Sequence, residues 1–385
     1  MNFTVAIPSW GLGTGGTRFA RFPMLGEPRN IIEKLEDASL LNSLIKVTPK
    51  VSLHFPWDEV RDFSEIIDYA FSNHLKFDSV NSNTFQDKKN ETNLSYKFGS
   101  LTHTNSSIRD LAIEHNLQCI DYGLKLGSKS LTLWIPDGSN FPGQMHTRRA
   151  LDRYLDSTAK IYQYLPDDWL LLLEHKLYEP SFYSTVNNDW GTSYAFSCHL
   201  GEKAKCLVDL GHHAPNSNIE GIVGRLIRFK KLGGFHFNDS SYGDDDLDAG
   251  SVNPFRLFLI YNELSDAEYC GDLPNDQAYL IDQSHNITDP IESLICSSLE
   301  LQRAYIQSQL INRESLYYYQ QNNDPLLALE ELKKAFRFDV SLILKMARYR
   351  LGGEIDPIKA YRDMNYRQKK SEARKFKNNS SVGIV

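Results

Sequence analysis

Residues 169–176 read WLLLLEHK, an unbroken apolar run that ends in an acidic residue, a histidine and a lysine. A run of this kind is typical of a strand covered on both faces, as in a parallel sheet flanked by helices. Similar short apolar runs recur between about residues 50 and 285, and each is followed by a longer stretch with helical periodicity. This alternation predicts an α/β protein with a parallel sheet.

Seven strands are predicted from these runs, at residues 51–55, 77–81, 130–136, 169–176, 205–210, 234–238 and 278–282. The clearest intervening helix carries an apolar stripe at Ile219, Ile222, Val223, Leu226 and Ile227. Further helices are predicted at residues 31–45, 148–164, 254–264 and 290–310. Seven strands with such crossovers suit a (β/α)8 TIM barrel, and we expect the eighth strand near residues 336–343.

Three segments follow from this pattern. Residues 1–46 are interpreted as an N-terminal loop and helix, residues 47–345 as the catalytic barrel, and residues 346–385 as a C-terminal helical extension with a basic tail. The tail, from Arg362 to Lys377, is expected to be solvated, with a contact to a neighbouring subunit as the alternative.

Composition excludes several classes of protein. A chain of 385 residues with 41% apolar and 24% charged residues can bury a large core, unlike a disordered chain. The net charge of −7 argues against a nucleic-acid-binding surface, which needs an excess of lysine and arginine. No run of eighteen apolar residues and no secretory signal is seen, so no membrane partner is expected. Five scattered cysteines indicate reduced thiols, as in a cytoplasmic protein.

Acidic and imidazole side chains follow successive predicted strands at their carboxyl ends, where barrel enzymes place their active sites. They are Glu174, His175 and Lys176 after one strand, Asp209 and His212 after the next, and then His236 and Asp282. Several carboxylates at one barrel mouth would repel one another unless a cation lay between them. Carboxylates with one or two imidazoles suit Mg²⁺, Mn²⁺ or Co²⁺.

The loop after His236 adds further oxygen ligands. Asp244 and Asp246 stand two positions apart, so their side chains point the same way in an extended loop. An EF-hand is excluded, because Ala249 replaces the required glycine and Phe255 the bidentate glutamate. A single acid at a strand end is more often a helix cap or an ion-pair partner, so the metal interpretation depends on the joint arrangement.

Two other motifs are discounted. The glycine-rich stretch at residues 11–16 resembles a phosphate-binding loop, but residues 17–23 do not read as the start of a helix. The sequence contains no G-x-S-x-G motif, so nothing in it supports an esterase with a catalytic serine triad.

Three segments closely resemble the L-rhamnose isomerases of the Pseudomonas type, within the xylose isomerase-like barrels. They are PSWGLGTGGTRF at residues 8–19, LHFPWD at residues 53–58 and FHFNDSSYGDDD at residues 235–246. The resemblance implies two divalent ions per subunit, most often Mn²⁺ with Co²⁺ or Mg²⁺ as alternatives, and an aldose–ketose isomerase. The expected substrate is a small-molecule sugar, L-rhamnose or a wider range of aldoses, and the expected assembly is a homo-oligomer, either a tetramer or a dimer.

The resemblance also implies roles for individual residues. One ion would be held by Glu174, Asp209, His236 and Asp282, and the other by Glu174, His212, Asp244 and Asp246. Lys176 would polarise the substrate carbonyl, while His54 and Trp134 would line the sugar pocket. Independently of the resemblance, Trp57 offers an aromatic face of the kind on which sugars stack. Phe19 would reach the site of a neighbouring subunit.

We expect His54 to move a proton during ring opening, with Asp58 fixing its tautomer, or else to bind a sugar hydroxyl without proton transfer. A hydride would pass between C2 and C1 of the sugar. The alternatives are a ketose 3-epimerase or another sugar isomerase on the same barrel, a metal-dependent hydrolase, and a sugar-binding regulator without turnover.

Overall fold

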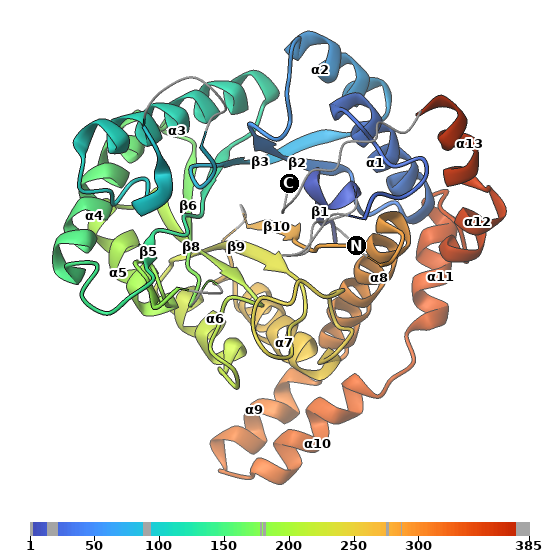
Figure 1. Ribbon diagram of the computed structural model, residues 1–385. Helices are drawn as coiled ribbons and strands as arrows, with labels where there is room; N and C mark the ends of the chain where they lie inside the picture. The colour runs from blue at the N-terminus through green and yellow to red at the C-terminus, as the bar shows by residue number, and fades with distance from the viewer. Residues whose placement is uncertain are drawn as a thin grey trace.

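The computed structural model describes residues 3–13, 22–87, 94–177, 179, 182–274, 277–285 and 287–374. Eight parallel strands form a closed barrel (Figure 1). In barrel order they are β1 (Ala6–Pro8), β10 (Ala278–Ile281), β9 (Leu232–Phe237), β8 (Ala204–Asp209), β6 (Leu170–Glu174), β4 (Ser130–Leu133), β3 (Lys76–Ser82) and β2 (Lys50–Phe55). The predicted TIM barrel is therefore confirmed.

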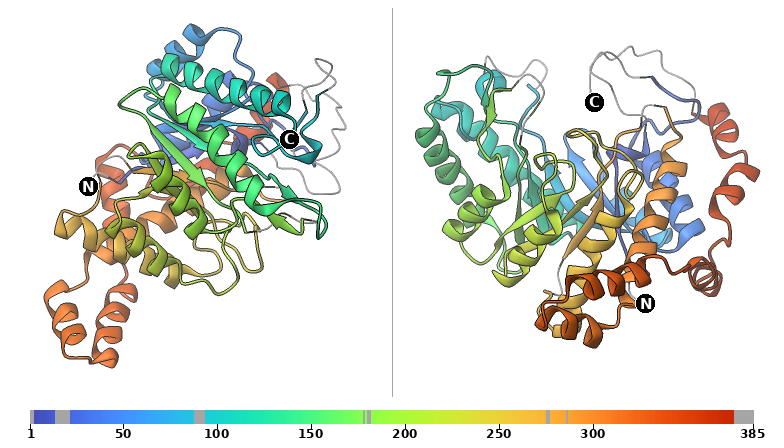
Figure 2. Two further views of the ribbon diagram at one scale, coloured as in Figure 1. Left: turned by 90° about the vertical axis from the view of Figure 1, so that its left-hand side faces the viewer. Right: turned by 90° about the horizontal axis from the view of Figure 1, so that it is seen from below.

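A helix follows each barrel strand and packs outside the barrel (Figures 1 and 2). The eight are α1 (Ile31–Ile45), α2 (Phe63–Ser72), α3 (Ser106–Leu126), α4 (Thr147–Tyr164), α5 (Trp190–Leu200), α6 (Ile219–Arg228), α7 (Pro254–Cys270) and α8 (Pro290–Gln309). Five of them were predicted: α1, α4, α6 and α8 coincide with the predicted helices to within a few residues, and α7 begins as predicted but extends six residues further. A short antiparallel pair, β5 (Gly138–Ser139) and β7 (Ser184–Thr185), joins the loops after β4 and β6.

The eighth strand is not where the sequence placed it. Residues 336–343 lie at the end of α10 (Pro325–Phe336) and the start of α11 (Ser341–Arg350), so that prediction is wrong. The barrel is closed instead by β1, which pairs with both β2 and β10. Strand β1 therefore belongs to the barrel, although it lies inside the segment at residues 1–46 that was interpreted as an N-terminal loop and helix. The other boundaries of the three predicted segments stay a prediction.

The apolar runs form the barrel because their side chains are buried on both faces. Leu171, Leu172 and Leu173 of β6 are each fully buried, and each contributes roughly 1.5–3 kcal/mol to folding. At Gly234 of β9 a side chain would collide with the backbone of Ala278 on the neighbouring strand, which explains a glycine inside this strand. Among the described residues, no helix has the length and apolar character needed to cross a bilayer.

Beyond the barrel, α9 (Arg313–Gln321) and α10 form a hairpin that projects from one side (Figures 1 and 2). Helix α11 leads back to α12 (Pro357–Asp363) and α13 (Tyr366–Ala373). Helix α12 packs against α1 and α8. The chain thus returns to its own N-terminal helix.

The basic tail is solvated only in part. Arg362 and Lys369 are exposed, whereas the side chains of Arg367 and Arg374 are 13% and 2% exposed, so the expectation of a solvated tail is wrong for these two residues. Asp37 of α1 is fully buried and receives bonds from Arg367 Nη1 at 2.8 Å and Arg374 Nη2 at 2.7 Å. The hydroxyl of Tyr366 donates a third bond at 2.6 Å. Arg367 and Arg374 are therefore ion-pair partners of a buried acid.

We predict that Asp37→Asn lowers the free energy of unfolding by about 3–5 kcal/mol, because it leaves two guanidinium groups beside a neutral partner. Urea-induced unfolding measures this change. The matched control is Glu36→Gln, whose partly exposed carboxylate pairs with Lys370 and Arg374 and whose loss costs less than about 1 kcal/mol. Equal stability of the two variants would contradict the role of Asp37.

Candidate active site

Four side chains meet at the carboxyl ends of four adjacent barrel strands. Glu174 ends β6, Asp209 ends β8, His236 lies in β9, and Asp282 follows β10. Because these strands are neighbours and run parallel, their carboxyl ends lie at the same mouth of the barrel. The register places Asp209 directly beside His236.

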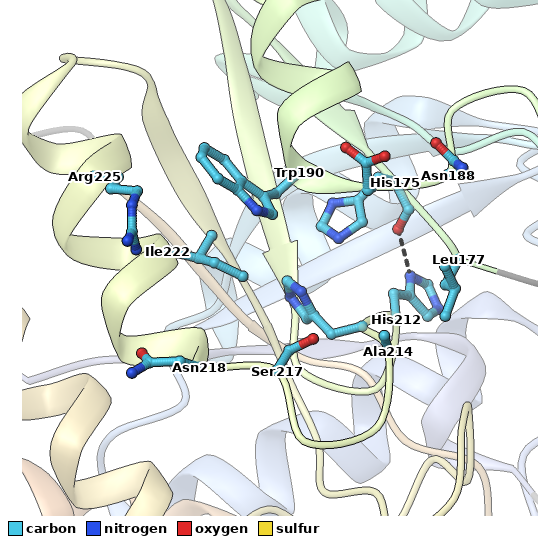
Figure 3. A pocket seen from close by; sticks show the side chains of 12 residues that line it. His175, Leu177, Asn188, Trp190, His212, Ala214, Ser217, Asn218, Ile222 and Arg225 are labelled. Atoms are coloured by element: carbon cyan, nitrogen blue, oxygen red, sulfur yellow. Dashed lines mark hydrogen bonds between the residues drawn. The ribbon is translucent and has the colours of Figure 1, made fainter.

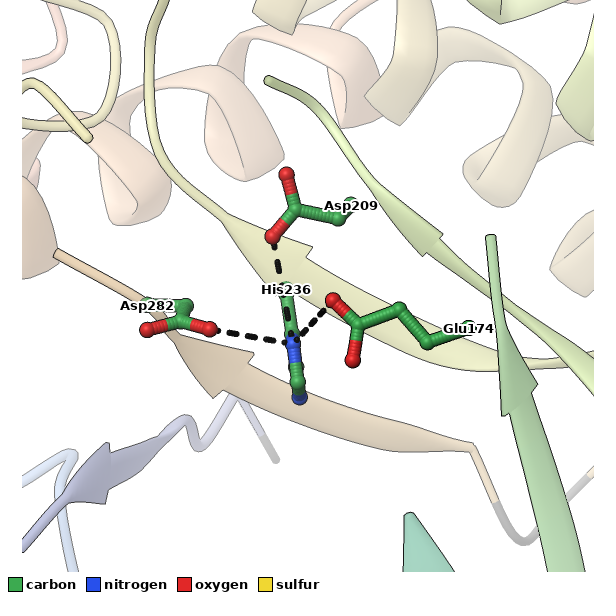
Figure 4. A group of neighbouring side chains, drawn as sticks. All are labelled: Glu174, Asp209, His236 and Asp282. Atoms are coloured by element: carbon green, nitrogen blue, oxygen red, sulfur yellow. Dashed lines mark hydrogen bonds and ion pairs between the residues drawn. The ribbon is translucent and has the colours of Figure 1, made fainter. Parts of the chain in front are cut away.

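The four side chains converge on one point (Figure 4). His236 Nδ1 lies 3.1 Å from Glu174 Oε1, 3.2 Å from Asp282 Oδ2 and 3.8 Å from Asp209 Oδ2. One ligand atom from each residue lies within 4.8 Å of all the others. In the part of the chain that the structure describes, this is the only group of three or more acidic, histidine or cysteine side chains that converges in this way.

The cluster carries an excess of negative charge. Burial, with Glu174 and Asp282 nearby, raises the pKa of Asp209 to about 6. Burial alone would lower the pKa of His236, but the carboxylates of Glu174 and Asp282 raise it well above its ordinary value. Burial alone would also raise the pKa of Glu174, but His236 and His212 hold it well below its usual range. A protonated imidazole therefore balances part of the charge.

This donor set fits a divalent cation. Three carboxylates and one imidazole offer oxygen and nitrogen ligands of the kind that Mn²⁺, Co²⁺ and Mg²⁺ accept in proteins. A bound cation would neutralise the carboxylates and let His236 act as a neutral ligand. The cluster can therefore hold a metal ion.

Two further residues orient these ligands, and the sequence did not single them out as site residues. Asn238 Nδ2 donates to both oxygens of Asp209, at 3.0 and 3.1 Å. Trp10 Nε1 donates to Asp282 Oδ1 at 2.8 Å. Both contacts join segments that are distant in the chain, so only the folded structure reveals them.

The second predicted group of ligands is less compact. His212 Nδ1 lies 3.2 Å from Glu174 Oε1, and its Nε2 lies 3.0 Å from Asp244 Oδ1. Asp244 also pairs with Lys176. Burial, with Asp244, Asp282 and Asp209 nearby, raises the pKa of Asp246 well above its usual range. These residues adjoin the cluster of four, but they do not form a second converging group within the described residues.

Lys176 lies among acids and beside an aromatic ring. Its ammonium group pairs with Asp244 and, at 2.6 Å, with Glu179 Oε2, and it lies 5.0 Å from the centre of the Trp134 ring. Burial alone would lower the pKa of Lys176, but Asp244 and Glu179 raise it. The amine therefore stays protonated at neutral pH and can donate a hydrogen bond to a substrate oxygen.

Asp58 does not contact the ring of His54 in the predicted way. Its Oδ2 accepts from the backbone N–H of His54 at 2.8 Å and from the hydroxyl of Ser9, and its Oδ1 pairs with Lys34 at 2.6 Å. The ring Nδ1 of His54 is buried and has no hydrogen-bond partner in the described chain. Burial lowers the pKa of His54 to about 3. Asp58 thus positions the backbone of His54, and the prediction that it fixes the tautomer of the ring is wrong.

Aromatic side chains form a wall beside this site. The rings of His54 and Trp57 stack at 3.8 Å, and Phe85 lies edge-on to Trp57 at 5.8 Å and to Trp134 at 4.8 Å. Trp57 and Trp134 were predicted here, whereas Phe85 was missed, because its place in the wall depends on contacts with residues distant in the chain. Phe19 lies outside the described residues.

Comparisons with known sequences identify related proteins. A family model described as RhaA, L-rhamnose isomerase, matches residues 7–246. Probable sugar isomerases of Mesorhizobium japonicum and Rhizobium meliloti are 58% and 57% identical over 383 residues, which span 100% of this chain and 89% of each relative. An L-rhamnose isomerase of Rhodopirellula baltica is 26% identical over 239 residues, which span 57% of this chain and 53% of that protein.

Solved structures share the fold. An L-ribulose 3-epimerase superposes with a TM-score of 0.57 at 16% identity, over 80% of this chain and 98% of that one. A D-tagatose 3-epimerase-like protein gives a TM-score of 0.55 at 12% identity, over 78% and 98% of the two chains. At such low identity the likeness shows the barrel fold alone.

We predict that Asn238→Ala raises the dissociation constant for Mn²⁺ by about 10- to 100-fold, because Asp209 loses the donor that fixes both its oxygens. Isothermal titration with Mn²⁺ measures the change. The matched control is Asn116→Ala, which removes a buried asparagine from α3, where its side chain bonds to Ala112. Unchanged Mn²⁺ affinity in Asn238→Ala would show that Asp209 needs no such support.

Proposed function

The chain belongs to the RhaA family of L-rhamnose isomerases, and from this premise we propose that it interconverts L-rhamnose and its ketose, L-rhamnulose. Other aldoses of similar shape are proposed as additional substrates. The resemblance to the Pseudomonas type of this family is part of the same proposal.

One observation carries the proposal. Glu174, Asp209, His236 and Asp282 converge within 4.8 Å at the barrel mouth, and Glu174 is only two residues from Lys176, whose amine is held protonated. An aldose and its ketose differ by the positions of two hydrogens on C1 and C2, and negative charge develops on both oxygens during the exchange. The reaction therefore needs positive charge close to both oxygens. Lys176 and a cation held by the four converging residues would supply it.

We propose two divalent ions per subunit, with Mn²⁺ preferred over Co²⁺ and Mg²⁺. The four converging residues would hold one ion, and Glu174, His212, Asp244 and Asp246 would hold the other. When bound, the ions supply Lewis acids that stabilise negative charge on the sugar oxygens. Since Asp244 pairs with Lys176 in this structure, a second ion requires Asp244 to exchange that partner.

The chain's own residues would orient the sugar and handle its protons. In the proposed reaction a hydride moves from C2 to C1, so that one C–H bond breaks and another forms. The proton lost from O2 would pass to water, while O1 would gain a proton from Lys176, which water would then reprotonate, so that the protons balance. His54 would bind a ring hydroxyl or shuttle the proton that opens the ring, and Trp57 and Trp134 would cover the apolar face of the sugar.

A ketose 3-epimerase is the second candidate, since such enzymes use one metal ion. It is supported by the fold shared with solved epimerases and by the single converging group found among the described residues. An epimerase also needs two glutamates, one on each side of the reacting carbon. Asp282 stands where a second glutamate would help, which favours the isomerase.

We further propose a cytoplasmic homo-oligomer, a tetramer or a dimer, in which Phe19 enters the site of a neighbouring subunit. The acidic net charge of −7 supports a small-molecule substrate over nucleic acid. A membrane partner is likewise not proposed.

We predict that chelator-treated protein is inactive and that Mn²⁺ restores ketose formation from L-rhamnose more fully than Co²⁺ or Mg²⁺. D-Allose and L-lyxose are assayed in parallel, with ketose measured colorimetrically and C3 epimers separated by chromatography. Appearance of a C3-epimerised ketose without aldose turnover would replace the isomerase with the epimerase.

Glu174→Gln is predicted to lower turnover by at least about 1,000-fold, because it removes a charge that the metal cluster shares, while circular dichroism stays unchanged. The control Asp78→Asn removes a carboxylate near the start of β3 that pairs with Lys50, far from the barrel mouth. Near-normal turnover of Glu174→Gln would refute the proposed metal centre.

A further inference from the structure

The backbone that carries Lys176 lies beyond the end of the barrel sheet. The last pair that β6 forms with β8 joins Glu174 to Leu207, and its pairing with β4 ends one residue earlier, at Leu173. Residues 175–177 therefore continue past the sheet. Buried backbone groups are nearly always paired, so other parts of the chain must supply their hydrogen-bond partners.

Residues 185–187, at the end of β7 and just after it, supply the partners of Lys176, and we call them the supporting segment. The backbone N–H of Lys176 donates to the backbone oxygen of Asn187 at 3.0 Å, and its backbone oxygen accepts from Thr185 Oγ1 at 2.6 Å. Asn187 Nδ2 also donates to the backbone oxygen of Glu174 at 3.1 Å. Thr185 and Asn187 are both buried, so these bonds lie away from solvent.

The residues on either side of Lys176 bond in the opposite direction. The backbone oxygen of His175 accepts from His212 Nδ1 at 3.0 Å (Figure 3). The backbone N–H of Leu177 donates to the backbone oxygen of His212 at 3.2 Å. Successive residues of a β-strand bond to opposite edges in this way. The segment is thus held extended, and side chains two positions apart, those of Glu174 and Lys176, point to the same face.

The supporting segment is itself anchored to the loops after β3 and β4. The backbone N–H of Val186 donates to the backbone oxygen of Asp137 at 2.8 Å. The carboxylate of Asp137 is buried and accepts from the backbone N–H groups of Ser100 and Thr102 at 2.8 and 2.9 Å. A two-stranded sheet as short as β5 and β7 is not stable by itself, so these bonds keep it in place.

We propose that the supporting segment positions Lys176 for the isomerisation and that the hydroxyl of Thr185 is a positioning group; this inference rests on the proposed function. The amine of Lys176 pairs with Asp244 and Glu179, so the side chain is held at its far end by these acids and at its backbone by the supporting segment. Thr185 acts through the backbone of Lys176. Displacement of a reacting group by about 1 Å can lower a rate 100-fold.

Three variants test the role of the hydroxyl. Thr185→Val keeps the shape of the side chain but removes the donor to Lys176, and Thr185→Ser keeps the donor. The matched control is Thr158→Val in α4, where another buried threonine hydroxyl donates to a backbone oxygen, that of Tyr154, at 2.8 Å. Circular dichroism verifies that all three variants are folded.

Hydrogen exchange measures the support directly, without any need for turnover. Mass spectrometry of the metal-loaded full chain follows the backbone amides of residues 174–177. We expect them to exchange about 10-fold faster in Thr185→Val, because the bond that closes this segment is lost. Thr185→Ser and Thr158→Val are expected to exchange like the parent.

Steady-state kinetics with L-rhamnose separates positioning from a general loss of stability. We expect Thr185→Val to lower kcat by about 10- to 100-fold with KM within about 2-fold of the parent, because a misplaced Lys176 affects the transition state more than sugar binding. Thr185→Ser is expected to restore most of kcat.

Parental exchange of residues 174–177 in Thr185→Val would overturn the proposal, and so would faster exchange with a normal kcat. An equal fall of kcat in Thr158→Val would also overturn it, since the effect would then not be specific to this segment. A parent protein without isomerase activity would refute the proposed function instead, and hydrogen exchange would still show whether Thr185 holds the backbone of Lys176.

Discussion

The rest of the site depends on one electrostatic constraint, the close approach of two buried carboxylates and a third, partly exposed one at the mouth of the barrel. Glu174, Asp209 and Asp282 all face Nδ1 of His236. Burying an ionised carboxylate costs several kcal/mol unless an opposite charge compensates it. The raised pKa values of Asp209 and His236 express this cost, since each group takes up a proton more readily than it would in water. A single divalent cation would compensate the same negative charge. It would also leave the imidazole of His236 neutral and able to act as a ligand.

The barrel is what keeps these charges together. Their strands, β6, β8, β9 and β10, are consecutive neighbours in the closed sheet, and parallel pairing brings their carboxyl ends to one side. Register fixes the details: Asp209 pairs with His236, and Ile281 pairs with Phe237. The buried leucines of β6 stabilise the barrel, and this stabilisation offsets the repulsion between the acidic side chains at its mouth. Apolar packing inside the strands therefore supports a polar cluster that would separate in a looser structure.

This division explains how much the sequence could predict. An apolar run that ends in an acidic residue is a local pattern in the sequence. In a parallel sheet the carboxyl ends of all strands lie at one edge, so the barrel and the four converging residues could be predicted from such runs. Strand β1 could not be predicted, because Ala6–Pro8 is too short to show any periodicity. Asn238, Trp10 and Phe85 were missed for another reason: an amide or an aromatic ring beside a strand acquires a role only from a partner elsewhere in the chain. The pairing of the basic tail with Asp37 joins residues more than 300 positions apart, and no local pattern announces it.

That long-range pairing has a consequence for the sugar side of the site. Helix α1 carries both Asp37, which the tail holds, and Lys34, which lies one turn earlier and binds Asp58. Asp58 in turn bonds to Ser9, just after β1, and to the backbone of His54 at the end of β2. Asp58 thus ties β1 to β2, and helix α1 joins this contact to the C-terminal helices through Asp37. Since β1 is only three residues long, its own ladder is short, and the bond from Asp58 adds a fixed point for the backbone of His54, whose ring stacks on Trp57.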